Sequence, residues 1–109
     1  MEIKKLHVKG IPPYKQTPAD RRERENQVIR TATLRREAEH KFPTAMKQSI
    51  RLTITYRRQK SRSDAANIIG GIADALNGIA YDDDRQITEI HYQETEGSLD
   101  EYHLIVEPV

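Results

Sequence analysis

The stretch from residue 48 to residue 77 constrains the fold most, because its hydrophobic period changes within it. Residues 48–57 alternate between apolar and polar side chains, which is typical of a strand with one buried face. The apolar positions are Ile50, Leu52, Ile54 and Tyr56. Over residues 64–77 apolar side chains recur at helical spacing instead, at Ile68, Ile69, Ile72, Ala73 and Leu76. The sequence therefore predicts a strand followed by an amphipathic helix, with Ser61 or Ser63 as its cap and Asn77-Gly78 as its stop.

Weaker patterns complete the predicted order of elements. Residues 2–9 read as a first strand that ends at two prolines. A charged helix starts near Thr17 and runs to about Lys41, and we expect much of it to be exposed. Its thin apolar stripe comprises Val28, Ile29 and Ala32, with Leu34 and Ala38 as further candidates. Residues 86–93 and 101–107 read as a terminal hairpin. The order β-α-β-α-β-β predicts an α/β (α+β) fold with a mixed sheet, two helices on one face and the second helix as a crossover. At 109 residues we expect one domain, residues 1–109.

Charge is divided unevenly along the chain. Residues 1–62 hold 17 Lys/Arg and 6 Asp/Glu, whereas residues 63–109 hold one Arg and 11 Asp/Glu, so the balances are +11 and −10 and sum to the net +1. This asymmetry favours a polyanion or metal partner, but the two halves could equally attract each other within the fold or across a dimer. The chain has no cysteine, no signal-peptide pattern and no long apolar run, so we expect an intracellular, cytoplasmic protein with no membrane partner and no thiolate chemistry.

Carboxylates cluster in the acidic half. Asp64 precedes the second helix, Asn67 and Asp74 share its polar face, and Asp82, Asp83 and Asp84 follow it. Mg²⁺ and Mn²⁺ prefer such hard oxygen ligands, so Asp64 and Asp83 or Asp84 would form a metal site if they met at one end of the fold. Each acid also has a structural reading, because an Asp at a helix N-terminus stabilises the helix dipole and Asp is a common turn residue.

Cations lead directly into this acidic stretch. Four of them suit a phosphate backbone: Arg57, Arg58, Lys60 and Arg62. The alternative is a solvated strand end. The four histidines show no metal-ligand spacing, and we expect all of them to be structural, with His91 and His103 facing each other across the hairpin. Gly70-Gly71 costs the helix about 2 kcal/mol relative to alanine, so we expect a packing reason for the pair. A neighbouring helix, a dimer partner or a nucleic-acid backbone could approach closely there, and the alternative is a simple contact between helix and sheet.

Three short motifs resemble the RusA-like family of Holliday-junction resolvases, whose fingerprint reads Asp-x-Asp-Asn-x-x-Lys, then Asp-Ala-Leu, then Asp-Asp-x-Gln. In this chain they are Asp64-Ala65-Ala66-Asn67-Ile68-Ile69-Gly70, Asp74-Ala75-Leu76 and Asp83-Asp84-Arg85-Gln86. The resemblance implies a dimeric, magnesium-dependent endonuclease that cleaves branched DNA without an organic cofactor. It also implies that Asp64 and Asp84 hold the metal with Asp83 beside them, while basic residues, including Lys15 in an early loop, bind phosphates.

Two positions differ from the family pattern. The second aspartate is Ala66 and the lysine is Gly70, and neither can bind a metal or a phosphate through its side chain. Either Asn67, Asp82 or Lys60 compensates, or cleavage is weakened or lost. The leading hypothesis is therefore a metal-dependent, structure-selective DNA endonuclease that acts as a homodimer. The alternatives are a homologue that binds branched DNA without cutting, and a dimeric scaffold whose basic and acidic halves pair.

Overall fold

The strand with the clearest alternation lies inside a four-stranded mixed sheet. The computed structural model describes residues 2–15, 20–59 and 63–109. The strands are β1 (Lys4–Lys9), β2 (Ile50–Arg58), β3 (Ile87–Glu96) and β4 (Glu101–Pro108), in the order β1-β4-β2-β3. β2 pairs antiparallel with β4 and parallel with β3, and β1 pairs antiparallel with β4. The predicted fold class, element order and mixed sheet are confirmed.

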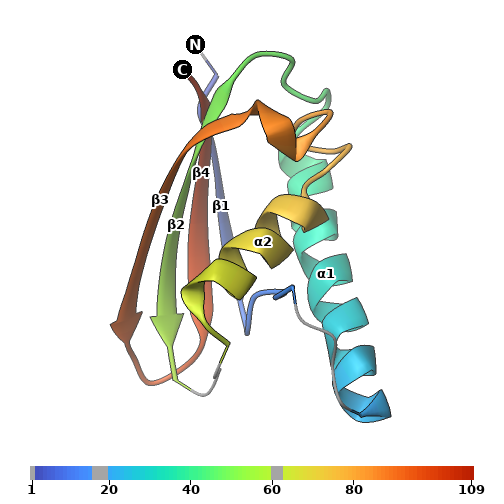
Figure 1. Cartoon of the computed structure of the whole chain (residues 1–109), viewed down its shortest axis with the longest axis vertical. Coiled ribbons are helices and arrows are strands. Elements are labelled where there is room, and N and C mark those ends of the chain that lie inside the picture. Colours follow the sequence, from blue (N-terminus) through green and yellow to red (C-terminus); the bar gives the residue numbers. More distant parts are fainter. Residues whose placement is uncertain (1, 16–19, 60–62) are drawn as a thin grey trace.

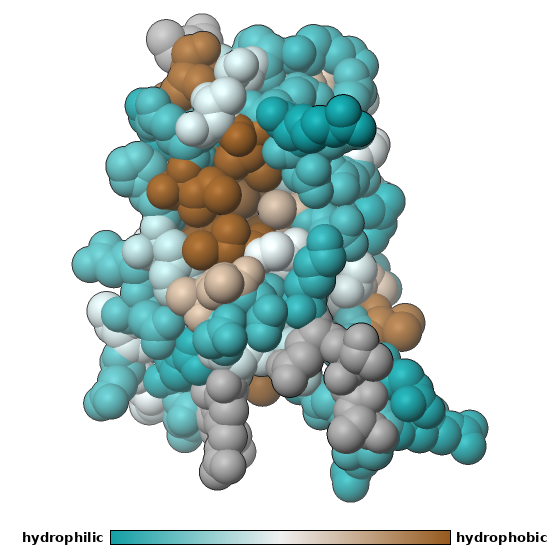
Figure 2. Space-filling model, in the orientation of Figure 1, coloured by the Kyte–Doolittle hydropathy of each residue, from teal (hydrophilic) through white to brown (hydrophobic). Residues whose placement is uncertain are grey.

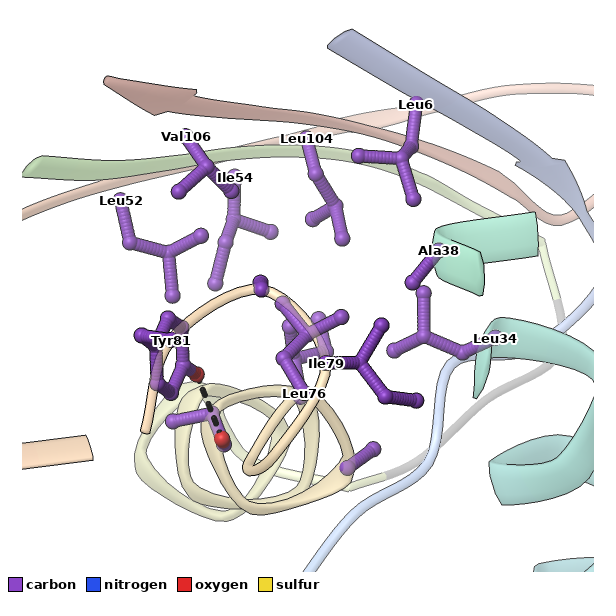
Figure 3. Close-up of a cluster of buried hydrophobic side chains, with 14 of the residues drawn as sticks. Leu6, Leu34, Ala38, Leu52, Ile54, Leu76, Ile79, Tyr81, Leu104 and Val106 are labelled. Carbon is purple, nitrogen blue, oxygen red and sulfur yellow. Dashed lines mark hydrogen bonds between the residues drawn. The ribbon is translucent and has the colours of Figure 1, made fainter. Parts of the chain in front are cut away.

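Two helices cover one face of this sheet (Figure 1): α1 (Arg21–Lys41) and α2 (Ala65–Ala75). The alternating side chains of β2 point toward them and are fully buried, as are Leu104 and Val106 of β4. Ile68 and Ile72 of α2 and its C-cap residue Leu76 belong to the same buried cluster. Leu34 and Ala38 of α1 close the side of the core toward β1 (Figure 3). The apolar stripe predicted for residues 64–77 is therefore the contact between α2 and the sheet. α2 is also the crossover between the parallel strands β2 and β3, as predicted.

The predicted terminal hairpin is wrong. β3 and β4 follow each other closely in sequence, but β2 lies between them and pairs with both. The connection after Glu96 crosses the end of β2, where Gly97 donates a hydrogen bond to the carbonyl of Arg58 at 3.1 Å. Alternation identifies a strand but not its neighbours, and a short connection favours a hairpin by default. For the same reason His103 does not face His91, and its ring stacks on that of His7 instead.

α1 begins later than its sequence predicts, and of its predicted thin stripe Leu34 and Ala38 are buried. Asp20 is the N-cap and accepts a hydrogen bond from the backbone N–H of Glu23 at 2.8 Å, while Thr17 lies outside the described residues. Val28 and Ile29 are 69% and 62% exposed, because the first half of α1 extends past the sheet (Figure 1). Among the described residues, no helix combines the length and the apolar character that a membrane span requires.

α2 is capped by an acid rather than by a serine. The Asp64 carboxylate accepts a hydrogen bond from the backbone N–H of Asn67 at 2.9 Å, so the N-cap is Asp64 and not the predicted Ser63. Ser61, the other predicted cap, lies outside the described residues. The expected close approach at the glycine pair exists, and its partner is a loop. A Cβ on Gly71 would lie 2.5 Å from the Pro13 carbonyl oxygen and from Tyr14 Cα. The loop after β1 is therefore seated directly on α2.

Candidate metal and nucleic-acid site

Two of the predicted acids meet at the C-terminal end of α2. The side-chain amide nitrogen of Asn77 lies 3.4 Å from Asp74 Oδ1 and 3.3 Å from Asp84 Oδ2, so it joins the two carboxylates. The amide oxygen of Asn77 is buried and has no hydrogen-bond partner among the described residues. Two carboxylates brought to one helix end suit a hard divalent cation such as Mg²⁺, which typically takes one or two carboxylates and completes its shell with phosphate oxygens and water.

Side chains from distant parts of the chain hold this end of α2 in place. Arg35 of α1 donates to the carbonyl oxygens of Ala75 at 2.8 Å and Asn77 at 3.2 Å, which satisfies carbonyls that the helix end leaves open. The buried Tyr81 hydroxyl donates to the Ala73 carbonyl at 2.5 Å. Burial raises the pKa of Tyr81, and the nearby carboxylates of Asp84 and Asp74 raise it further. Tyr81 therefore remains a neutral donor beside the two acids.

Sequence reasoning missed three residues of this arrangement. Asn77 was interpreted only as a helix stop, and Arg35 and Tyr81 were not singled out. The signal for Asn77 was its position three residues after Asp74, which places the two on one face of a helical turn. Arg35 lies 40 residues from Ala75 in sequence, and no local pattern reveals that contact.

The three consecutive aspartates have different surroundings. Asp82 forms an ion pair with Lys47 at 2.9 Å. Asp83 is the N-cap of a short 3-10 helix, η1 (Asp84–Gln86), and accepts from the backbone N–H of Arg85 at 2.9 Å. That hydrogen bond, together with the Arg85 charge, lowers the pKa of Asp83. Asp82 and Asp83 therefore have structural roles, as expected for aspartates in a turn. Of the three, Asp84 is the one that contacts Asn77, which also contacts Asp74.

Asp64 does not join Asp83 and Asp84 within one chain. It lies at the N-terminal end of α2, where Asn67 is its partner, and Asp84 lies beyond the C-terminal end. The 11 residues of α2 separate the two ends by about 16 Å at roughly 1.5 Å per residue. Among the described residues, no third carboxylate or histidine lies within ligand reach of Asp74 and Asp84.

Lys15 lies beside the glycine that replaces the family lysine. Its backbone N–H donates to the Asn67 carbonyl at 2.8 Å, and a Cβ on Gly70 would lie 3.4 Å from Lys15 Cβ and Cδ. The stem of Lys15 therefore crosses the helix surface that Gly70 leaves open, and its exposed end lies in the same region of α2 as Asp64 and Asn67. A longer side chain at position 70 would occupy the same space. Ala66 is exposed and offers no ligand atom.

A groove connects Lys15 with Asp74. It encloses about 710 Å³ between α1, α2 and the loop of residues 13–15. Lys15 and Arg24 supply positive charge to its walls, Asp74 lies at its acidic end, and Gly71 forms part of its floor. A groove that has cations along its length and a carboxylate at its end can hold a phosphate backbone beside a bound cation.

Of the predicted basic run, the described residues Arg57 and Arg58 do not line this groove. Arg58 forms an ion pair with Glu94 at 3.0 Å and lies over the ring of Tyr56. The exposed side chain of Arg57 packs against Gly97. Lys60 and Arg62 lie outside the described residues. The structure thus adds Arg24 to the phosphate-binding candidates, while Arg58 has an intramolecular acidic partner.

Comparison with known proteins provides independent evidence. The sequence profile of the family described as endodeoxyribonuclease RusA matches residues 8–105 of the 109-residue chain. That range includes α1, α2 and η1, together with Asp64 and Asp84 at the two ends of α2. No curated protein gives a significant match. Since the family profile covers nearly the whole chain, the chain belongs to the RusA endodeoxyribonuclease family.

Proposed function

We propose that this protein is a Mg²⁺- or Mn²⁺-dependent, structure-selective endonuclease that hydrolyses phosphodiesters at branched DNA such as Holliday junctions. The observation that carries the proposal is the convergence of the Asp74 and Asp84 carboxylates on the Asn77 amide nitrogen at the C-terminal end of α2. Family membership adds the reaction class.

The role that we propose for each residue follows from its position in the fold. Asp84 and Asp74 hold the cation, Asn77 orients them, and Asp83 fixes the turn that presents Asp84. A bound divalent cation would activate water and neutralise charge that develops on phosphorus. Lys15 and Arg24 hold the phosphate backbone in the groove and so bring a phosphodiester to the acidic end of α2. Arg57, Lys60 and Arg62 contact a neighbouring arm of the DNA.

The position of Asp64 favours a homodimer whose active sites are shared. A single ion cannot contact both ends of an α2 helix about 16 Å long. β3 is an edge strand that starts directly after η1 and runs toward the end of the molecule where α2 begins (Figure 1). A two-fold axis beside β3 would reverse this direction and bring Asp64 of one protomer toward Asp84 of its partner. Two equivalent sites would then match two strands of a four-way junction.

The test is cleavage of synthetic four-way junctions by the purified full chain with Mg²⁺ or Mn²⁺. We expect Asp84→Asn and Asp64→Asn to abolish cleavage while the fold, monitored by circular dichroism, is kept. Asp82→Asn is the matched control, because this neighbouring acid pairs with Lys47, and it should retain activity. Activity that survives in Asp84→Asn would exclude the proposed site.

A mixed dimer separates shared sites from sites within one chain. Protomers that carry Asp64→Asn and Asp84→Asn are co-expressed with different tags. If each active site combines Asp64 of one protomer with Asp84 of the other, every heterodimer keeps one intact site, and nicking of the junction should return. Sites confined to one chain predict no activity in any combination.

A second function is favoured by Ala66, which is exposed beside Asp64 and offers no ligand atom. A homologue with a weakened site would bind junctions in a salt-sensitive manner without cutting them. In that case Ala66→Asp should create cleavage, whereas Gly70→Lys should add little because Lys15 already occupies that surface. The scaffold hypothesis predicts no junction binding in a gel-shift measurement, even at low salt.

A further inference from the structure

Two histidines and a glutamate converge on the sheet face opposite the helices. His7 of β1 and His103 of β4 are direct cross-strand partners, and Glu101 precedes His103 by two residues on the same face of β4. The two imidazole rings stack with centroids 4.2 Å apart and planes 2° apart. The Nε2 atoms of His7 and His103 lie 3.8 and 3.7 Å from the same Glu101 oxygen, Oε1. Their neighbours in sequence, Leu6 and Leu104, point into the core, so the three side chains point outward.

This arrangement brings together three side chains that can each supply a ligand atom to a transition metal. One ligand atom from each of the three residues lies within 4.8 Å of the others. Tetrahedral zinc holds nitrogen and oxygen ligands at about 2.0–2.2 Å, which separates two ligand atoms by roughly 3.3–3.5 Å. The two contacts to Glu101 Oε1 are a few tenths of an ångström longer than this. The stacked imidazole rings would also rotate out of their parallel planes to aim both nitrogen atoms at one ion. The backbones of β1 and β4 are fixed by their ladder, so the ligands are held close together before a metal binds.

We propose that His7, Glu101 and His103 bind Zn²⁺ with a water molecule in the fourth position. Imidazole nitrogen suits zinc and related ions, whereas Mg²⁺ prefers oxygen ligands alone. The site is therefore chemically distinct from the acids at the ends of α2, and the proposal does not depend on nuclease activity. Cations flank the site, because Glu101 is in register with Lys9 on one side and Arg57 on the other. They weaken the attraction for a metal without removing a ligand.

The structural consequence would be a link between the two ends of the chain. β1 is an edge strand, and among the described residues it pairs with β4 alone. A metal shared by His7 and His103 would join β1 to β4 through side chains as well as backbone. Because the folded state alone presents the three ligands together, Zn²⁺ should raise the stability of the fold by mass action.

The test is calorimetric titration of the untagged, chelator-treated full chain with ZnCl₂. We expect one Zn²⁺ per chain, unaffected by a large excess of Mg²⁺, and a rise in Tm. His7→Ala or His103→Ala should weaken binding by at least about tenfold, because losing even an outer-shell partner of a metal ligand costs about 10–100-fold. His91→Ala is the matched control, since His91 is an exposed strand histidine beside Glu89.

Several results would overturn the proposal. The proposal fails if the unaltered chain does not bind Zn²⁺, or if His91→Ala weakens Zn²⁺ binding as much as His7→Ala does. It also fails if Mg²⁺ displaces Zn²⁺, because the ion would then be bound by the carboxylates at the ends of α2. Circular dichroism checks that the variants fold, and Glu101→Gln provides a second variant that keeps the shape of the side chain while removing its charge. Nuclease activity is measured separately, so failure of this proposal and failure of the nuclease proposal are distinguishable.

Discussion

Two adjacent glycines in α2 have different neighbours, and this difference yields a prediction. A Cβ on Gly71 would meet backbone atoms of Pro13 and Tyr14 at 2.5 Å, whereas one on Gly70 would meet only the flexible Lys15 side chain at 3.4 Å. Alanine gains about 1 kcal/mol of helix propensity at either position, but displacing a backbone segment costs about 1–3 kcal/mol. Gly71→Ala should therefore lower the free energy of unfolding and Gly70→Ala should not, as measured by urea denaturation. Equal effects of the two changes would contradict this account.

Asp83 provides a prediction about acid stability. The backbone N–H of Arg85 holds its pKa below the ordinary value of 3.8. A depressed carboxyl pKa contributes stability that is complete above about pH 5 and is lost as the pH falls below 3.8 toward the folded-state pKa. Asparagine also caps helices well, so Asp83→Asn removes the charge and keeps the cap. Between about pH 5 and 3 the variant should lose less stability than the unaltered chain, measured by urea denaturation at each pH. Parallel pH profiles would contradict the assignment.

At the scale of elements, α1 supplies one wall of the groove beside α2. Arg24 lines that groove, and the neighbouring Arg22 is exposed but does not line it. If the groove holds DNA phosphates, Arg24→Ala should weaken junction binding for all sequences alike and reduce the slope of log affinity against log salt by about 1. Arg22→Ala is the matched control and should leave that slope nearly unchanged. A gel-shift series over several salt concentrations measures both, and equal slopes for the two variants would place the DNA elsewhere.

The elements also show what the sequence could and could not predict. Residues 48–57 and 64–77 revealed β2 and α2 because each buries one face, and burial of one face leaves a period in the sequence. The positions of β3 and β4 on opposite sides of β2 left no such trace, since strand pairing depends on segments far apart. The acids at both ends of α2 were predicted as candidates. The link between Asp74 and Asp84 was not, because it requires the turn after α2, which Arg35 of α1 and Tyr81 hold in place.

At the scale of the whole molecule, much of the charge asymmetry is used within the fold. Arg51 of β2 forms ion pairs with Glu89 of β3 at 2.5 Å and with Glu107 of β4 at 3.1 Å. Arg58 and Lys47 pair with Glu94 and Asp82 in the same manner. Arg51, Arg58 and Lys47 therefore have acidic partners in the second half of the chain. The cations that we propose for DNA, Arg24 of α1, Lys15 and Arg57, are not among these pairs.

The proposed dimer makes a final prediction at this scale. Apolar side chains gather on the surface between β3 and α2 (Figure 2). On the edge strand β3, Ile90 is 47% exposed and lies in register with Leu52, so it is on the helix-covered side of the sheet. A two-fold contact along β3 would bury Ile90 in both protomers and bring the opposite ends of the two α2 helices together.

Ile90→Glu should then shift the protein from dimer to monomer in analytical ultracentrifugation and abolish junction cleavage at the same time, because the shared active sites require both protomers. Ile29→Glu is the matched control, since Ile29 is an exposed aliphatic residue on α1, 62% accessible, that does not line the groove, and it should leave both properties intact. If Ile29→Glu dissociates the dimer and Ile90→Glu does not, the protomers meet through α1. Asp64 would then have no route to the partner's Asp84 along β3.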